Sequence, residues 1–522
     1  MRRFLNVWHR SHTTALFATM RTKVFPDRWS VLLGQISVVS FLIVAVSGVV
    51  LMFFYDPSME QVTYAGSYGP LTGVEMSRAF ASTVDLSFEV RGGLFVRQVH
   101  QWSSLVMTAA IVLHLLWLFF TGAFRGPRRR TWVSVVGVLV LAMAASLTGA
   151  ALPDDLLSGT SMAVLDGVLT ATPVVGSWLS ALLFGGSVPG GINAIFYPVH
   201  VVALPAALVI AFVATAILGR RHEPARHAGR LRTKDNAVDT NLRAFVARSA
   251  GLFLLVTGVI GLMAATLTVN PIWQYGPADP ASAAAGSSPT WSLAFLDGAL
   301  RLTPGWEFVW MGRTWSVAIL LPVLVCALFF AIVAAYPYLE QWVSGDHEEH
   351  QQLERPRNNP TRTGIGVAGI VFYGVLWAAA GSNAIAVAFD VSVEGFMYVL
   401  QVLLVLGPVA GFDIARRICI GLQRRDRATV LDGHETGQVV RTRSGGYIEV
   451  HVAVDARERE RLAGYEDHLP VPLQRDVHGQ TRLPQRLQTR MSLLFHRDRI
   501  PPLREGCGCS RESVGDRGHS AG

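Results

Sequence analysis

Long apolar stretches, each bounded by polar or basic residues, dominate this chain. Eight of them are long enough to cross a bilayer, because about 20 apolar residues in a helix span the hydrocarbon core. Their approximate ranges are 29–54, 97–120, 132–152, 196–218, 247–267, 315–336, 364–380 and 396–414. We therefore predict an all-α polytopic membrane protein with eight transmembrane helices, the first four of which form a bundle.

The composition supports a membrane protein rather than a soluble globule. Of 522 residues, 51% are hydrophobic and only 16% are charged, whereas about 25% are charged in soluble domains. The net charge of +8 comes from basic residues clustered in loops, so we interpret them as topology signals and not as a nucleic-acid surface. Cysteines at 326, 419, 507 and 509 do not suggest a disulfide framework. The first apolar span is too long and too far along the chain for a cleavable signal.

Basic residues alternate between the loops and predict the topology. Segments 1–28, 121–130 and 219–246 are rich in Arg or Lys, whereas 153–195 contain neither. Basic loops stay on the cytoplasmic side, so eight spans place both termini in the cytoplasm of a plasma-membrane protein. Within the outer segment, the sequence of residues 163–183 predicts short amphipathic elements that lie on the membrane surface.

The same pattern divides the chain into segments. They are a cytoplasmic N-terminal segment (1–28), a four-helix half (29–218), a cytoplasmic loop (219–246), a second transmembrane half (247–416) with an outer loop (268–314), and a cytoplasmic tail (417–522). In the tail, β-prone runs at 439–443 and 447–452 flank a Ser-Gly-Gly turn and predict a hairpin. Cys507 and Cys509 with His496 offer metal-binding side chains, but a solvated terminus is the preferred interpretation.

Two histidines on the second span are candidates for cofactor binding. His100 and His114 are fourteen residues apart, which is about 21 Å along a helix and nearly one face. Histidine within a membrane usually faces the protein interior and has a function. The spacing suits axial ligands of two stacked haems, and the alternative is a pair of histidines held by hydrogen bonds between helices. Gly34 and Gly48 on the first span repeat the spacing. Ordinary helix packing is the more frequent reason for glycines in a span, and the spacing shared with His100 and His114 is what suggests a flat cofactor.

Several segments carry a resemblance to a known family. They are FFTGAFR (119–125), LPDDLLSGT (152–160), PVVGSWLS (173–180), LLFGG (182–186), NPIWQYGP (270–277), LDGALRL (296–302), HETG (434–437) and YIEVH (447–451). With the histidines of span two and His200 on span four, they resemble cytochrome b of the quinol–cytochrome c reductase (cytochrome bc) complex in its actinobacterial form. The resemblance covers nearly the whole chain, with the spans in order.

The resemblance implies two haems b held by four helices, and the residues for the outer haem are all present. His100 and His200 would be its axial ligands. Arg97 would pair with a haem propionate, a charge-assisted contact that stabilises a buried carboxylate. Gly48 and Gly149 would give room to the macrocycle.

The inner haem site departs from the family pattern. A second histidine is expected about fourteen residues after His200, but 212–215 read Phe-Val-Ala-Thr. His222 is about 33 Å further along a helix than His200 and cannot substitute. Trp117 replaces an expected arginine, and Val135 replaces an expected glycine. We predict that His114 lacks its partner and that the inner haem is absent or five-coordinate.

The outer quinol site departs as well. The family carries Pro-Glu/Asp-Trp-Tyr where this chain has Pro289, Thr290, Trp291 and Ser292. The family's carboxylate is a general base for a quinol proton, and a threonine hydroxyl cannot hold that proton at neutral pH. Other carboxylates that are candidates for this role are Asp154, Asp155, Asp297 and Glu307. For the two aspartates after Pro153, helix N-capping is the preferred interpretation.

The resemblance implies an oxidoreductase subunit that takes electrons from quinol, by implication menaquinone, at the outer face. Its implied partners are a Rieske-type iron–sulfur subunit, a cytochrome c subunit and a second copy of itself. The alternative is a single-haem or non-catalytic paralogue that acts as an electron conduit or assembly partner. A transporter with the same fold is disfavoured, since the sequence shows neither broken midplane helices nor internal repeats.

Overall fold

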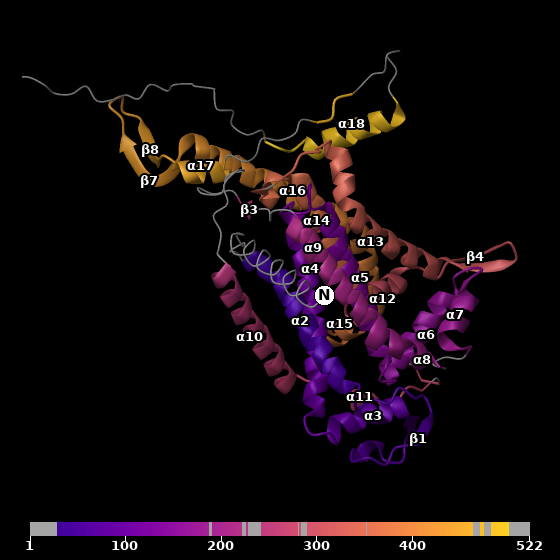
Figure 1. Cartoon of the computed structure of the whole chain (residues 1–522). Coiled ribbons are helices and arrows are strands. Elements are labelled where there is room, and N and C mark those ends of the chain that lie inside the picture. Colours follow the sequence, from indigo (N-terminus) through magenta and orange to yellow (C-terminus); the bar gives the residue numbers. More distant parts are fainter. Residues whose placement is uncertain are drawn as a thin grey trace, which may run out of the picture.

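The computed structural model describes residues 29–186, 191–221, 226–227, 242–279, 281–282, 290–350, 352–462, 470–473 and 482–500. Within them, eight helices are long and apolar enough to cross a membrane, which confirms the predicted number. They are α2 (Trp29–Leu51), α4 (Gly93–Phe120), α5 (Arg129–Ala151), the run α8 (Ile192–Pro198), η2 (Val199–Ala203) and α9 (Leu204–Arg221), then α10 (Leu242–Thr266), α13 (Val317–Ser344), α14 (Pro360–Ala380) and α16 (Val393–Asp432) (Figure 1).

Helices α2, α4, α5 and α9 form a bundle. α2 packs along α4, α5 packs along α9, and α4 contacts α5. In the half near His114 the interior is filled by apolar side chains such as Phe41, Ile111, Val135 and Leu208, none more than 7% exposed. In a bilayer, van der Waals packing of this kind holds helices together.

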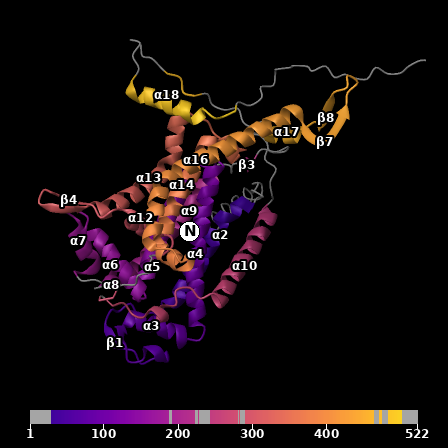
Figure 2. The ribbon, with the colours of Figure 1, turned by 180° about the vertical axis from the view of Figure 1, so that it is seen from behind.

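A second group of helices packs beside the bundle. α14 contacts α16 and α12 (Ala294–Leu302), and α13 contacts α5. α10 lies apart from this group, against α2 and α4, at the left of Figure 1 and the right of Figure 2.

Short elements cover the end of the bundle that carries His100. They are β1 (Gln61–Thr63) paired with β2 (Glu75–Ser77), η1 (Gly69–Leu71), α3 (Arg78–Phe88), α6 (Leu156–Thr170), α7 (Gly176–Phe184), α11 (Ile272–Tyr275), and β4 (Glu307–Trp310) paired with β5 (Arg313–Ser316). Ser77 begins α3 by accepting a hydrogen bond from the N–H of Phe80, as N-cap residues do. The segment 163–183, predicted to lie on the surface, falls in α6 and α7.

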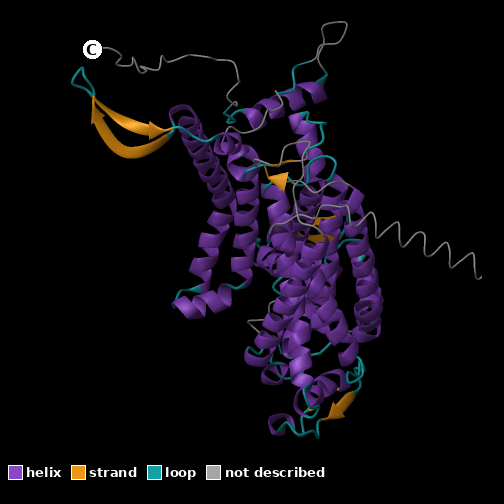
Figure 3. Cartoon of the chain, turned by 60° about the vertical axis from the view of Figure 1, so that its left-hand side comes forward, coloured by secondary structure: helices purple, strands orange, loops and turns teal. Residues whose placement is uncertain are grey.

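The other end carries the tail and the remaining elements. They are β3 (Arg226–His227) paired with β6 (Gln352–Leu353), η3 (Pro356–Asn358), β7 (His434–Arg441), β8 (Tyr447–Val452), α17 (Ala456–Leu462) and α18 (Leu483–His496). The short helix α15 (Ser382–Phe389) joins α14 to α16 at the opposite end of these two helices (Figure 1). β7 and β8 form the predicted hairpin, drawn in orange in Figure 3. α16 runs beyond the predicted end of the eighth span at residue 414, to Asp432. Cys507 and Cys509 lie outside the described residues, and His496 is buried on α18.

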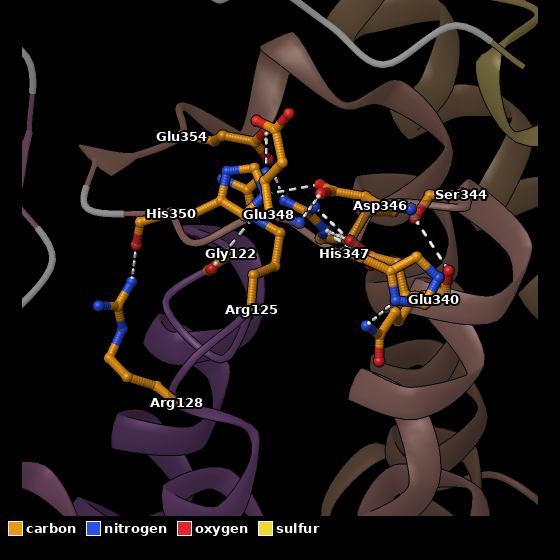
Figure 4. Close-up of polar contacts among 12 residues, drawn as sticks. Gly122, Arg125, Arg128, Glu340, Ser344, Asp346, His347, Glu348, His350 and Glu354 are labelled. Atoms are coloured by element: carbon orange, nitrogen blue, oxygen red, sulfur yellow. Dashed lines mark hydrogen bonds and ion pairs between the residues drawn. The ribbon is translucent and has the colours of Figure 1, made fainter. Parts of the chain in front are cut away.

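A buried ionic cluster joins the bundle to the second group of helices (Figure 4). Arg362, with a side chain 1% exposed, pairs with Glu340 of α13 and with Glu354 in the following loop. Arg125, in the loop between α4 and α5, pairs with Glu354 at 2.9 Å. Burial would raise the pKa of Glu354, but the charges of Arg125 and Arg362 outweigh it and lower that pKa. The N–H of Glu354 also donates to the carbonyl of Thr121 at 2.9 Å, so the two halves are joined by charge and backbone together.

Candidate functional site

His100 on α4 and His200 on the π-helical turn η2 face each other inside the bundle. Their ring centres are 6.3 Å apart. Nδ1 of His100 lies 3.0 Å from the Val44 carbonyl oxygen and 3.1 Å from Ser47 Oγ. Nδ1 of His200 lies 3.1 Å from Thr148 Oγ1. A partner on one ring nitrogen fixes the orientation of the imidazole and leaves the other nitrogen, here Nε2, for a metal.

The separation of the two rings suits one metal ion between them. Imidazole nitrogen binds a metal at about 2 Å, and ring centres 6.3 Å apart leave room for two such bonds. A haem iron with two axial histidines requires this arrangement. The donor set of His100 and His200 therefore fits the iron of a haem.

Two glycines determine where these rings can lie. A Cβ at Gly48 would come within 3.0 Å of His100 Cε1, and one at Gly149 within 2.5 Å of His200 Cε1. The resemblance implies that these glycines give room to the macrocycle, and each also lies directly against the ring of a histidine. Each follows a hydroxyl residue that contacts a ring, in the pairs Ser47-Gly48 and Thr148-Gly149. The hydroxyls of Ser47 and Thr148 were not predicted from the sequence, although a hydroxyl residue precedes both glycines.

A Gly149→Ala variant is expected to bind less haem than the wild type. The added Cβ would overlap His200 Cε1 at 2.5 Å, so His200 must turn away from His100. The matched control is Gly137→Ala on the same helix, where a Cβ meets nothing within 4 Å. The haem absorbance per protein of the two purified variants checks this, and equal absorbance would contradict the role given to Gly149.

Arg97 presents an unpartnered donor at the same end of the bundle. Its side chain is buried, with the residue 4% exposed. Nη2 donates to the carbonyl of Asn270 at 2.8 Å, and the guanidinium lies 5.9 Å from the centre of the Trp273 ring. Nη1 has no hydrogen-bond partner among the described residues. A buried guanidinium donor calls for an anion, and a haem propionate has the right chemistry.

The surroundings of His114 are different. Its ring lies 6.0 Å from that of Trp117 and nearly parallel to it, at 17°. Its Nδ1 has no hydrogen-bond partner among the described residues. A Cβ at Gly34 would lie 3.6 Å from His114 Cε1, an ordinary van der Waals distance. His222 lies outside the described residues.

The part of α9 that would supply a second ligand is occupied by other contacts. Thr215 Oγ1 lies 2.7 Å from Ser134 Oγ, and the ring of Phe212 lies 5.2 Å from that of Phe41. His200 lies in a π-helical turn, which contains one residue more than a regular α-helical turn. The spacing between His200 and a residue on the same face of α9 therefore grows by one. The equivalent position therefore moves from Ala214 toward Thr215, and neither side chain binds iron.

The similarity to known proteins is extensive. A family model described as cytochrome b (N-terminal)/b6/petB matches residues 105–277. The cytochrome bc1 complex cytochrome b subunit of Streptomyces coelicolor is 42% identical over 458 residues, which cover 87% of this chain and 84% of that protein. The subunit of the same name from Mycobacterium tuberculosis is 41% identical over 469 residues, covering 89% and 84%. The chain belongs to the cytochrome b family.

A solved structure confirms the fold of this cytochrome b. A chain of a hyperthermophilic respiratory complex III superposes with a TM-score of 0.59 at 17% identity, over 80% of this chain and 99% of that one. Membership of the family and the eight apolar helices make this chain a multi-pass protein of the plasma membrane that binds haem b.

The family's quinol motif lies just before α12 in this cytochrome b. Pro289 lies outside the described residues. Thr290 Oγ1 and Ser292 Oγ are 3.1 Å apart, and the carbonyl of Ser292 accepts a hydrogen bond from Tyr373 at 3.4 Å. Ser292 is buried and Trp291 is half-buried. The motif thus presents hydroxyls, which donate and accept hydrogen bonds but hold no proton at neutral pH.

The four other carboxylates have different surroundings. Glu307 on β4 is exposed, and Asp297 pairs with Arg301 at 2.9 Å. Asp155 is the N-cap residue of α6, as predicted, but makes no side-chain capping bond. Asp154, with a φ of 53°, is buried beside it. Burial, opposed by a hydrogen bond from Ser77, raises the pKa of Asp154 to about 6.

Proposed function

We propose that this cytochrome b holds one haem b, between His100 and His200, as a subunit of a quinol–cytochrome c reductase complex. The contrast between the two ends of the bundle carries the proposal. His100 faces a second imidazole with ring centres 6.3 Å apart, whereas His114 lies against Trp117. Haem supplies one-electron chemistry when it is bound.

The residues at the complete site have separate roles. His100 and His200 hold and orient the iron, and their Nδ1 contacts keep both rings in place. Arg97 Nη1 binds a propionate. Thr290 and Ser292 offer hydrogen bonds to a quinol but no base, so the proton acceptor has to be a carboxylate outside the motif.

Of the four carboxylates, Asp154 suits this role best. Asp297 is paired with Arg301 and Glu307 is exposed. The pKa of about 6 at Asp154 is close to the working pH, which general-base catalysis favours.

The orientation and partners follow from the loop charges and the family. Both termini are cytoplasmic, because the basic loops 121–130 and 219–246 stay inside. The His100 end then faces outward. The partners are a Rieske-type iron–sulfur subunit, a cytochrome c subunit and a second copy of this chain, and the quinone is menaquinone.

A second candidate function is a paralogue that conducts electrons or assists assembly without oxidising quinol. The motif Thr290-Trp291-Ser292 favours it, because the family's carboxylate is missing there. The inner site favours it too. Without an inner haem, electrons would have to cross the roughly 21 Å between the levels of His100 and His114 in a single step.

Haem content and turnover together test the proposal. We expect a pyridine haemochrome assay on the purified complex to give about one haem b per chain, as one bis-histidine site requires. Quinol-dependent reduction of cytochrome c by the same sample separates the two functions. One haem with turnover supports the subunit, one haem without turnover supports the paralogue, and two haems would refute the single-site proposal.

A further inference from the structure

The long helix α16 extends past the membrane span that it forms. It contains 40 residues, Val393–Asp432, and is therefore about 60 Å long. The hydrocarbon core needs only about 30 Å, so about 20 residues from Val393 complete the crossing. From about Asp413 onward the helix has left the hydrocarbon core, on the cytoplasmic side in the orientation proposed above. Figure 2 shows this part running sideways from the span toward β7 and β8, so it does not simply continue along the direction of the span.

One face of this extension packs against the protein. Cys419, Gln423, Asp426 and Val430 are buried and recur at helical spacing. Asp426 accepts a hydrogen bond from Arg357 at 2.9 Å, and Gln423 donates to the carbonyl of the same residue. These contacts fix the rotation of α16 about its own axis. They therefore also determine which residues point away from the protein, on the face opposite the buried one.

The opposite face carries an apolar row that continues from the membrane span. Residues four apart along α16 are exposed and apolar on both sides of the surface: Tyr398 (67%), Val402 (58%), Leu406 (60%), Ile414 (58%), Ile418 (56%) and Leu422 (38%). Residues four apart lie on one side of a helix. The row therefore passes from lipid depth to the membrane surface as a ridge that winds round the helix by about 40° at each step.

Arginines flank the outer part of this row. The side chain of Arg417 is 78% exposed and pairs with Asp413 at 2.7 Å. Arg424 and Arg425 are exposed, and in the described part of the chain neither forms an ion pair. Residues 413–427 contain five arginines and two aspartates, hence a formal charge of +3.

We propose that this face of α16 (Ile414, Arg417, Ile418, Leu422, Arg424 and Arg425) binds anionic phospholipid of the cytoplasmic leaflet. A basic helix with an apolar row inserts that row at the boundary of headgroups and acyl chains. Its guanidinium groups match phosphate geometry with paired hydrogen bonds. The continuity of the row with the lipid-facing side of α16 favours lipid over a protein partner. The proposal rests on the orientation in the proposed function and not on the number of haems.

The test compares two triple variants of the full-length protein in its purified complex. Arg417→Gln/Arg424→Gln/Arg425→Gln removes the proposed site. The matched control, Arg441→Gln/Arg443→Gln/Arg459→Gln, removes the same charge from exposed arginines of the tail. The readouts are the phosphatidylglycerol retained per protein and the rise in thermal midpoint when phosphatidylglycerol, rather than phosphatidylcholine, is added to the detergent. Haem content of each sample serves as the folding check.

The expected result is that the site variant retains at least threefold less phosphatidylglycerol and loses its specific stabilisation, while the control behaves as the wild type. Equal lipid retention in all three proteins would overturn the proposal. So would an equal loss in both variants, which would indicate a diffuse charge effect. A variant that keeps its lipid but loses a protein subunit would assign the face to a protein partner. Because haem is counted separately, failure here is distinguishable from failure of the single-haem proposal.

Discussion

A His200→Ala variant will purify with almost no haem, and a His114→Ala variant will keep the wild-type amount. The first change removes one of two imidazoles whose ring centres are 6.3 Å apart, and a lone remaining histidine does not hold a six-coordinate haem b. The second removes a side chain that lies against Trp117 and faces no second histidine among the described residues. Haem content therefore falls from about one per chain to near zero in one variant only.

The measurement is the pyridine haemochrome spectrum, normalised to protein and accompanied by a fold check from circular dichroism. Gly137→Ala, on α5 where a Cβ meets nothing within 4 Å, controls for a substitution in the bundle that leaves the site alone. If the haem content of His114→Ala fell by half, the bundle would hold a second haem whose other ligand lies outside the described residues.

The membrane architecture was predictable because it depends on local sequence. A span needs only about 20 apolar residues in a row, and all eight predicted stretches are helices. The hairpin β7–β8 was predictable for a similar reason, since its Ser444-Gly445-Gly446 turn is contiguous with its strands. The pairing of His100 with His200 came instead from the resemblance, because no local pattern joins residues on different helices.

Features that depend on contacts between distant residues were not predictable. The hydroxyls of Ser47 and Thr148 matter only because their helices place them beside the rings of His100 and His200. The length of α16 was underestimated because arginines from Arg416 onward end the apolar pattern while the helix itself continues.

The buried ionic cluster shows the same limit. Arg125, Glu340, Glu354 and Arg362 are spread over 238 positions of the chain, counted inclusively from 125 to 362. Each resembles an ordinary charged residue near a loop, and most such residues are solvated. Only the fold shows that they are buried together.

An Arg362→Met variant is expected to lose about 3–5 kcal/mol of stability, the range for removing one partner of a buried ion pair. Arg362 is 1% exposed and donates to both Glu340 and Glu354. Methionine fills similar space but leaves the carboxylate of Glu340 buried without its cation. Arg125 still faces Glu354 at 2.9 Å, so the loss falls mainly on Glu340. The measurement is chemical or thermal unfolding of the protein in detergent.

Two comparisons separate this buried charge from surface charge. Arg78→Gln breaks the ion pair with Glu60, whose side chains are 46% and 65% exposed, and should cost at most about 1 kcal/mol. Arg362→Met/Glu340→Leu removes both members of the buried pair, and it should be more stable than Arg362→Met alone because no uncompensated carboxylate remains. The loss of stability in Arg362→Met/Glu340→Leu could instead equal the sum of the losses in Arg362→Met and in Glu340→Leu. The two charges would then act independently. The cluster would then not be the joint between the two halves of the molecule.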